Sequence, residues 1–193
     1  MIVEAQVHDE FIEKVVAGMK ALKVDHALKD GTQIGPVVDA AQMKQDEDYI
    51  AIARSEGGEV AWGGERLNRD TKGHYLSPAL ITNTTNDQRI NREEVFGPVA
   101  SVIEVANYDE ALAVANDTPF GLSSGIFTSS LKYSTDFRKK SAAGMVMINL
   151  ATAGVDYHVP FGGRKGSSMG SREQGRFAAE FYTSVKTAYT SAG

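Results

Sequence analysis

Val99-Ala-Ser-Val-Ile-Glu-Val-Ala106 begins the stretch of sequence that decides the fold, and Met145-Val-Met-Ile-Asn-Leu150 ends it. The first predicts a short strand, the second predicts a buried strand, and Gly121–Thr128 predicts a third strand between them. Helices are predicted in the two gaps, over residues 107–115 and Leu131–Lys140. Strand, helix, strand, helix and strand in this order imply two β-α-β crossovers and a parallel sheet.

Two longer helices are predicted on the N-terminal side of this stretch. Apolar residues recur at helical spacing over Asp9–Lys23. A second helix is predicted from Asp39 to about residue 57, because Asp39 followed by Gln42 has the form of a capping box. Strands are predicted at Glu59–Trp62 and Tyr75–Thr82. A parallel sheet needs cover on both faces, and these two helices can supply part of it.

The C-terminal side has a different character. Residues 151–175 are rich in Gly and Ser and show no clear period, which is typical of a functional or disordered loop when a segment is this long. A short helix is predicted near Arg172–Glu180. Phe181–Thr190 then alternates in β-branched and aromatic residues, which predicts a terminal strand.

Composition excludes several functional classes. The 193 residues are 42% apolar with a net charge of -5 and no long basic run, which disfavours nucleic-acid binding. No apolar run is long enough to span a membrane, and the N-terminus does not have the pattern of a signal peptide. Without cysteine the chain has no disulfide, thiolate metal site or cysteine nucleophile, and a cytoplasmic location fits. The four histidines show no paired metal-ligand spacing, so no metal is predicted.

Four segments in this order and spacing resemble the aldehyde dehydrogenase superfamily over nearly the whole chain. They are Gln33-Ile-Gly-Pro36 with the helix of Gln42, Glu93-Glu-Val-Phe-Gly-Pro98, Asn116-Asp-Thr-Pro-Phe-Gly-Leu122, and Val146-Met-Ile-Asn149 with Pro160-Phe-Gly-Gly-Arg-Lys165 and Arg172-Glu-Gln-Gly175. The resemblance implies an α/β fold with a mostly parallel twisted sheet flanked by helices. It also implies two parts, a partial catalytic domain over residues 1–180 and a C-terminal oligomerisation strand and tail over 181–193.

The resemblance further implies the oxidation of an aldehyde to a carboxylic acid with NAD or NADP. In this family a thiolate attacks the carbonyl carbon, hydride leaves for the nicotinamide, and water activated by a glutamate hydrolyses the thioester. That cysteine, that glutamate and most of the dinucleotide-binding domain would precede Met1, so the chain alone is expected to be inactive. Met1 is therefore interpreted as an artificial start or the start of a truncated reading frame. The sequence leaves the choice between NAD and NADP open.

Four residues match cofactor-binding positions of the family. Glu94 matches the glutamate that binds the ribose of the nicotinamide half, and Phe96 matches an aromatic residue beside the nicotinamide ring. Gln42 matches a position that reaches the adenosine-side ribose, although helix capping explains it equally well. Leu122 matches an apolar position of the cofactor pocket, for which core packing is the alternative.

The remaining matches concern the substrate. Val155 and Phe161 match positions that line the substrate tunnel, and Arg164 is a candidate source of positive potential there. Glu173 matches a carboxylate near the water-activating base and is a candidate proton relay. A plain acid in the first turn of a helix is its alternative, and the segment from Lys165 to Glu173 is one residue longer than the commonest family pattern.

Within the family, residues 154–165 and 170–175 look most like enzymes that oxidise 2,5-dioxopentanoate, the semialdehyde of α-ketoglutarate. Succinate semialdehyde and simple aliphatic aldehydes are the alternative substrates. A function of another class also stays open, namely a non-enzymatic fragment that binds a relative through its terminal strand. The expected partners are a small aldehyde and further copies of the chain, without nucleic acid or membrane.

Overall fold

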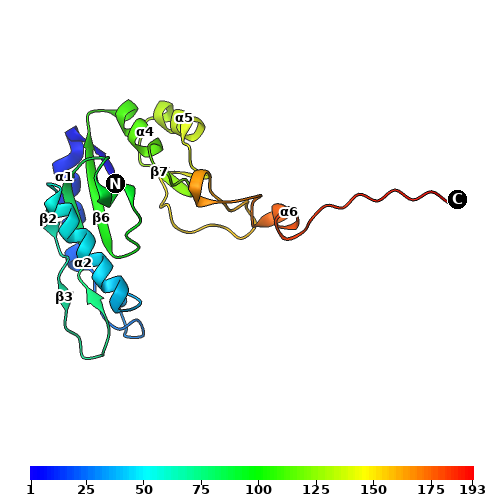
Figure 1. Cartoon of the computed structure of the whole chain (residues 1–193). Coiled ribbons are helices and arrows are strands. Elements are labelled where there is room, and N and C mark those ends of the chain that lie inside the picture. Colours follow the sequence, from blue (N-terminus) through cyan, green and yellow to red (C-terminus); the bar gives the residue numbers. More distant parts are fainter. The chain divides into compact units, whose positions relative to one another are not determined.

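The computed structural model describes all 193 residues and divides into two compact units, Met1–Val114 and Ala115–Gly193 (Figure 1). Each unit has its own sheet and its own helices. None of the helices has the length and apolar character needed to cross a membrane.

The first unit contains a four-stranded mixed sheet in the order β1-β6-β5-β2. β1 (Ile2–Glu4) and β5 (Ala79–Thr84) pair in parallel with the two edges of β6 (Val99–Val105). β2 (Glu59–Trp62) pairs antiparallel with β5. Three of the four strands are therefore parallel, as the sequence predicts for most of the sheet.

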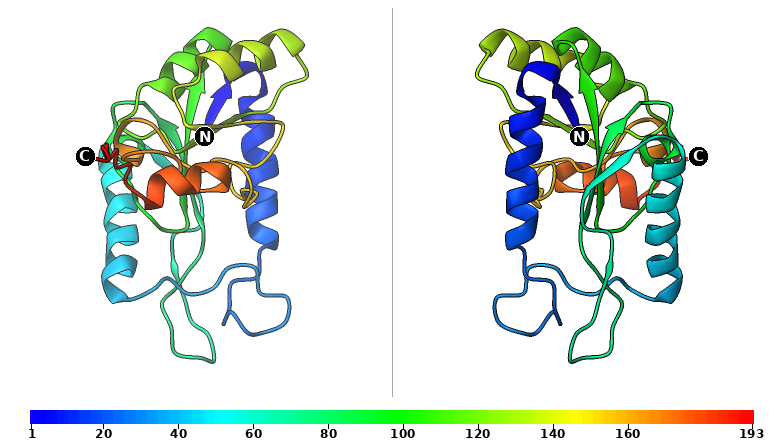
Figure 2. Two further views of the ribbon diagram at one scale, coloured as in Figure 1. Left: turned by 90° about the vertical axis from the view of Figure 1, so that its right-hand side faces the viewer. Right: turned by 90° about the vertical axis from the view of Figure 1, so that its left-hand side faces the viewer.

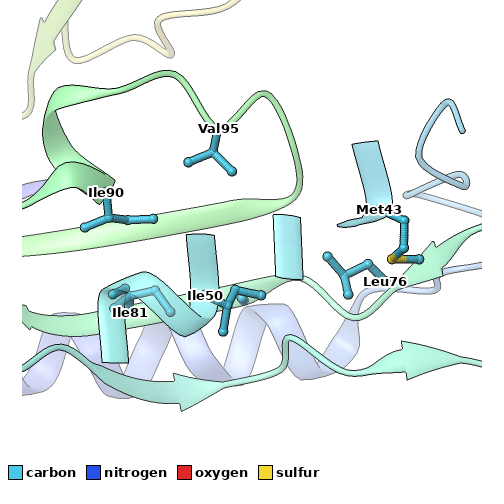
Figure 3. Packing of buried hydrophobic residues seen from close by; sticks show 8 residues of the cluster. Met43, Ile50, Leu76, Ile81, Ile90 and Val95 are labelled. Carbon is cyan, nitrogen blue, oxygen red and sulfur yellow. The ribbon is translucent and has the colours of Figure 1, made fainter. Parts of the chain in front are cut away.

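Two helices cover the two faces of this sheet, α1 (Ala5–Ala21) and α2 (Ala40–Ser55) (Figure 2). The alternating direction of the side chains along β5 explains this arrangement, because successive side chains of a strand point to opposite faces of the sheet. Leu80 packs with the apolar residues of α1. Its neighbour Ile81 packs in a second cluster with Ile50 of α2 (Figure 3). Both β5 residues are 0% exposed, so the predicted cover by the first two helices is confirmed.

Shorter elements complete the first unit. β3 (Arg66–Leu67) and β4 (Tyr75–Leu76) form a two-stranded hairpin. The predicted strand Tyr75–Thr82 is thus two strands, which Ser77 and Pro78 separate because proline has no N–H to donate to a ladder. α3 (Arg89–Arg92) follows β5 and leads into the loop before β6.

The second unit is built on one β-α-β crossover. β7 (Ser123–Ile126) and β8 (Met145–Ile148) pair in parallel, and α5 (Leu131–Lys140) connects them. α4 (Tyr108–Asn116) lies at the junction of the two units in the sequence. The remaining elements are short: η1 (Lys165–Ser167), η2 (Gly175–Phe177) and α6 (Ala178–Tyr182).

One of the two predicted crossovers is wrong. β6 and β7 lie in different sheets, so the helix between them does not connect paired strands. The reason is that β1 and β5 already occupy both edges of β6. β1 is not predicted from the sequence, because its three residues give too short a pattern to recognise.

The predicted terminal strand Phe181–Thr190 is not formed in this single chain. α6 includes Phe181 and Tyr182, and residues 183–193 form neither helix nor strand. Figure 1 shows this segment, in red, continuing from α6 without a neighbouring strand. A strand is stabilised by hydrogen bonds to a partner strand, and none is supplied to this segment. Its predicted role in oligomerisation stays a prediction.

Candidate functional site

The loop Glu93–Pro98 connects α3 to β6, and its first residue is firmly held. The Tyr49 hydroxyl donates to Glu93 Oε2 at 2.5 Å. Arg89 Nε and Nη2 donate to the two carboxylate oxygens at 3.0 and 2.9 Å. The Arg89 and Tyr49 hydrogen bonds lower the pKa of Glu93 from 4.5 to about 2. Glu93 is therefore an anchor of the loop.

The side chains of Glu94 and Phe96 in the same loop face solvent. Glu94 is exposed and makes no hydrogen bond or ion pair. Phe96 is 79% exposed, and its backbone has a φ of 60°, in the left-handed region that residues with a Cβ rarely adopt. Such a backbone conformation persists only where the surrounding structure holds it, and residues that adopt it cluster at functional sites. The loop thus presents a free carboxylate and a free aromatic ring two residues apart in the sequence.

Gln42 lies beside this loop. Asp39 Oδ1 accepts from the Gln42 backbone N–H at 2.8 Å, which confirms the predicted helix cap. The Gln42 side-chain Nε2 donates to Val95 O at 3.0 Å and to Asp46 Oδ1 at 2.7 Å. The structure therefore brings Gln42 together with the loop of Glu94 and Phe96, and its role in binding a cofactor stays a prediction.

Two residues at this loop were missed by the sequence analysis. Gln45 Nε2 also donates to Val95 O, at 2.8 Å, and Asp46 is 0% exposed behind Gln42. A signal for Asp46 does exist in the sequence. Met43, Asp46, Ile50 and Ala53 are the buried positions of α2, so an acid occupies a helical position that is otherwise apolar.

In the second unit, the segment Pro160–Lys165 packs against Leu122 through glycines. Gly121 O accepts from the Arg164 N–H at 2.9 Å and from the Gly144 N–H at 2.8 Å. A Cβ on Gly163 would lie 3.1 Å from Leu122 Cα, so only a residue without a side chain fits closely here. Leu122 stays 38% exposed beside this segment. The structure therefore joins a predicted cofactor position to a predicted substrate segment.

The predicted substrate residues lie along the same segment. Phe161 is half-buried, and its carbonyl oxygen accepts from the Glu173 N–H at 3.0 Å. The Arg172 guanidinium donates to Gly163 O, which ties the two stretches together a second time. Arg164 is exposed, and Val155 is 36% exposed. Glu173 and Phe161 are thus brought together by main-chain bonding, whatever the roles of their side chains.

The comparisons with known proteins agree with these motifs. The aldehyde dehydrogenase family model matches residues 1–188. The chain belongs to the aldehyde dehydrogenase family. This confirms the resemblance on which the site residues were assigned.

The chain covers only part of the length of individual members of the aldehyde dehydrogenase family. An α-ketoglutaric semialdehyde dehydrogenase of Bacillus subtilis is 38% identical over 98% of this chain and 39% of the relative. An α-ketoglutarate semialdehyde dehydrogenase of Haloferax volcanii is 40% identical over 98% of this chain and 40% of the relative. The chain therefore spans about two fifths of the length of these curated relatives.

Solved aldehyde dehydrogenases have the same fold. The crystal structure of betaine aldehyde dehydrogenase from Staphylococcus aureus in complex with NAD+ matches with a TM-score of 0.88 and 31% identity. The match covers 94% of this chain and 36% of that chain. It confirms the predicted α/β fold of an aldehyde dehydrogenase catalytic domain.

A nicotinamide dinucleotide fits the residues of the Glu93–Pro98 loop. Glu94 is a carboxylate with both oxygens available, which suits the two hydroxyls of a ribose. Phe96 offers an exposed ring face that suits a planar heterocycle. The chain has no cysteine, so a thiol nucleophile is not among its own residues.

Proposed function

We propose that this chain is the C-terminal portion of an NAD(P)-dependent aldehyde dehydrogenase, which oxidises an aldehyde to a carboxylic acid. The contrast between two adjacent glutamates carries this proposal: Glu93 is fully engaged by Arg89 and Tyr49, whereas Glu94 is left free beside the exposed Phe96. The nucleophilic thiol and the base glutamate would come from residues outside these 193, so the chain alone is expected to reduce no cofactor. A cytoplasmic location is part of the same proposal.

The residues of the chain then have distinct tasks. Glu94 accepts hydrogen bonds from the ribose of the nicotinamide half, and Phe96 lies beside the ring. Gln42 and Leu122 contribute to the remaining cofactor contacts. The bound NAD or NADP supplies a hydride acceptor. On the substrate side, Val155 and Phe161 line the tunnel, Arg164 provides positive potential, and Glu173 relays a proton.

For the substrate we propose 2,5-dioxopentanoate, the semialdehyde of α-ketoglutarate. The support comes from the sequence around Val159-Pro-Phe161 and from the similarity to the α-ketoglutarate semialdehyde dehydrogenases of Bacillus subtilis and Haloferax volcanii. Succinate semialdehyde is the nearest alternative. Betaine aldehyde dehydrogenase of Brucella anthropi, at 36% identity, makes a cationic aldehyde a third compound to test.

The cofactor role of Glu94 is tested by Glu94→Gln in the full-length enzyme that contains these residues. Loss of one charge-assisted hydrogen bond is worth roughly 1.5–3 kcal/mol, so kcat/KM for the cofactor should fall roughly 10- to 150-fold. The melting temperature should not change, since Glu94 has no partner in the fold. Glu93→Gln is the matched control and should lower the melting temperature with a smaller kinetic effect. Unchanged kinetics for Glu94→Gln would refute the cofactor assignment.

The substrate is tested by competition in the same enzyme. We expect a higher kcat/KM for 2,5-dioxopentanoate than for a neutral aldehyde of similar length, because that ratio measures discrimination. Arg164→Gln should reduce this preference, and Arg176→Gln serves as a control for loss of one positive charge. A preference for the neutral aldehyde in the unmodified enzyme would exclude a carboxylated substrate.

A second candidate function is a non-enzymatic fragment that binds a full-length relative. The exposure of Val185 and Tyr189, at 95% and 96%, favours it, because these side chains are left without cover. The reading frame around the chain separates the two candidates. Coding sequence with a cysteine region that continues into Met1 supports the enzyme, and a start and stop that enclose 193 residues support the fragment.

A further inference from the structure

The exposed conformation of Phe96 must be held by its surroundings. Its φ of 60° is unfavourable for a residue with a Cβ, and its own side chain makes little contact because it is 79% exposed. The residues on either side therefore have to fix the backbone. Val95, before it, has a buried side chain in the cluster that faces α2 (Figure 3).

The Val95 carbonyl is held by two glutamines of one helix face. Gln42 and Gln45 are three residues apart on α2, and the Nε2 groups of both donate to Val95 O, at 3.0 and 2.8 Å. A carbonyl oxygen has two lone pairs, so both are used. The peptide that joins Val95 to Phe96 is thereby attached to α2.

Asp46 orients the first of these glutamines. Its Oδ1 accepts from Gln42 Nε2 at 2.7 Å, so the two hydrogens of that amide are directed to Asp46 and to Val95. The side chain is 0% exposed and its Oδ2 has no partner, although burial of a carboxyl oxygen without a hydrogen bond is unfavourable. That burial raises the pKa of Asp46. An apolar residue would pack here without this penalty.

Gly97 brings the same carboxyl group into direct contact with the loop. A Cβ at Gly97 would lie 2.0 Å from Asp46 Oδ1, so the loop backbone lies directly over Asp46. On its other side the loop is fixed to the sheet, where the Ala79 N–H donates to Pro98 O at 2.9 Å. The loop is therefore attached at residues 95, 97 and 98, and Glu94 and Phe96 are left free.

We propose that Gln45 and Asp46 are positioning residues, which together with Gln42 clamp the Val95 carbonyl and so hold Glu94 and Phe96 where they meet the cofactor. This inference rests on the proposed function for its last step. The clamp itself concerns only contacts within the first unit and can be measured without a cofactor.

The first experiment measures backbone order in the 193-residue chain by ¹⁵N relaxation. Gln45→Met keeps the length of the side chain and removes the donor, and Asp46→Leu removes the acceptor. In both variants, the backbone order parameters of Phe96 and Gly97 should fall from about 0.85 to below about 0.6, while Leu80 and Ile81 in the core stay rigid. Asp46→Asn keeps an acceptor and should behave as the unmodified chain does.

Lys44→Met is the matched control, since Lys44 lies between the glutamines in sequence and pairs only with the exposed Asp48. It should leave Phe96 rigid. Unchanged order at Phe96 in Gln45→Met and Asp46→Leu would overturn the clamp. An equal loss of order in the core would also overturn it, because the residues would then support the whole unit rather than the loop.

The second experiment measures cofactor kinetics in the full-length enzyme. Gln45→Met and Asp46→Leu should raise KM for the cofactor severalfold, and Asp46→Asn should restore it. If Glu94→Gln changes these kinetics and the clamp variants do not, the positioning role fails and the proposed function stands. If Glu94→Gln has no effect either, the proposed function fails, and the relaxation measurement alone decides whether the clamp exists.

Discussion

Glu93 and Glu94 are neighbours of the same residue type whose surroundings differ completely. Glu93 receives hydrogen bonds from Arg89 and Tyr49, and these lower its pKa to about 2. A carboxylate whose pKa is lower in the folded than in the unfolded chain stabilises the fold while it is ionised. Its contribution is present above its ordinary value of 4.5 and is lost as the pH falls towards 2.

This gives a pH-dependent prediction for Glu93→Gln. The unmodified chain should be more stable than the variant above pH 4.5, and the difference should shrink between pH 4.5 and about 2. Denaturant unfolding at several pH values measures it. Glu94→Gln is the control, because it removes a carboxylate without an ion pair and should leave the free energy of unfolding at pH 7 unchanged. A difference that is the same at pH 2 and pH 7 would contradict the assignment.

The site residues themselves were predictable to different degrees. Short motifs predict Glu94, Phe96 and Leu122 as site residues, and the structure places all three at least partly exposed. No such motif predicts Asp46 or Gln45. Their importance comes from contacts about 50 positions further along the chain, which no local pattern contains.

The N-terminus of α2 shows that a helix cap can be predicted from a local sequence pattern. The pattern of Asp39 and Gln42 predicted a cap, and Asp39 Oδ1 does accept from the Gln42 N–H. Asp39→Ala should therefore lower the free energy of unfolding by about 1 kcal/mol, because one N–H of the first turn loses its acceptor. Urea titration followed by circular dichroism measures this change.

Asp48→Ala on the exposed face of the same helix is the control for Asp39→Ala. It removes one i,i+4 pair with Lys44, which is worth about 0.2–0.5 kcal/mol. Equal effects of the two substitutions would show that the cap contributes no more than a surface pair. An effect of Asp39→Ala below that of Asp48→Ala would contradict the cap energetics.

The bounds of individual helices and strands were predicted better from the sequence than the pairing of the strands. β2 and α5 have the predicted bounds, since residue type and period decide them. The predicted pairing of β6 with β7 was wrong, and the predicted terminal strand is not formed in a single chain. Strand pairing depends on which edges are free, and that is settled by distant segments such as β1.

One segment of the chain, at its C-terminus, has no place in the fold of a single copy. Residues 183–193 have no regular structure, and Val185 and Tyr189 are almost fully exposed. The residue pattern of Phe181–Thr190 nevertheless favours a strand, with Lys186 as its only charge. A segment of this composition with free main-chain N–H and C=O groups is suited to pairing with the edge of another sheet. We therefore expect the chain to associate through it.

Light scattering on the intact chain and on a version that ends at Tyr182 tests this association. The truncation keeps α6, so it should fold as before and become a monomer, while the intact chain forms dimers or larger species. Val185→Pro should act like the truncation, because proline removes an N–H donor and fits poorly within a paired strand. Ala192→Pro lies beyond the predicted strand and should leave the association unchanged. An intact chain that stays monomeric at high concentration would exclude strand pairing, and so would a truncated chain that associates as strongly as the intact one.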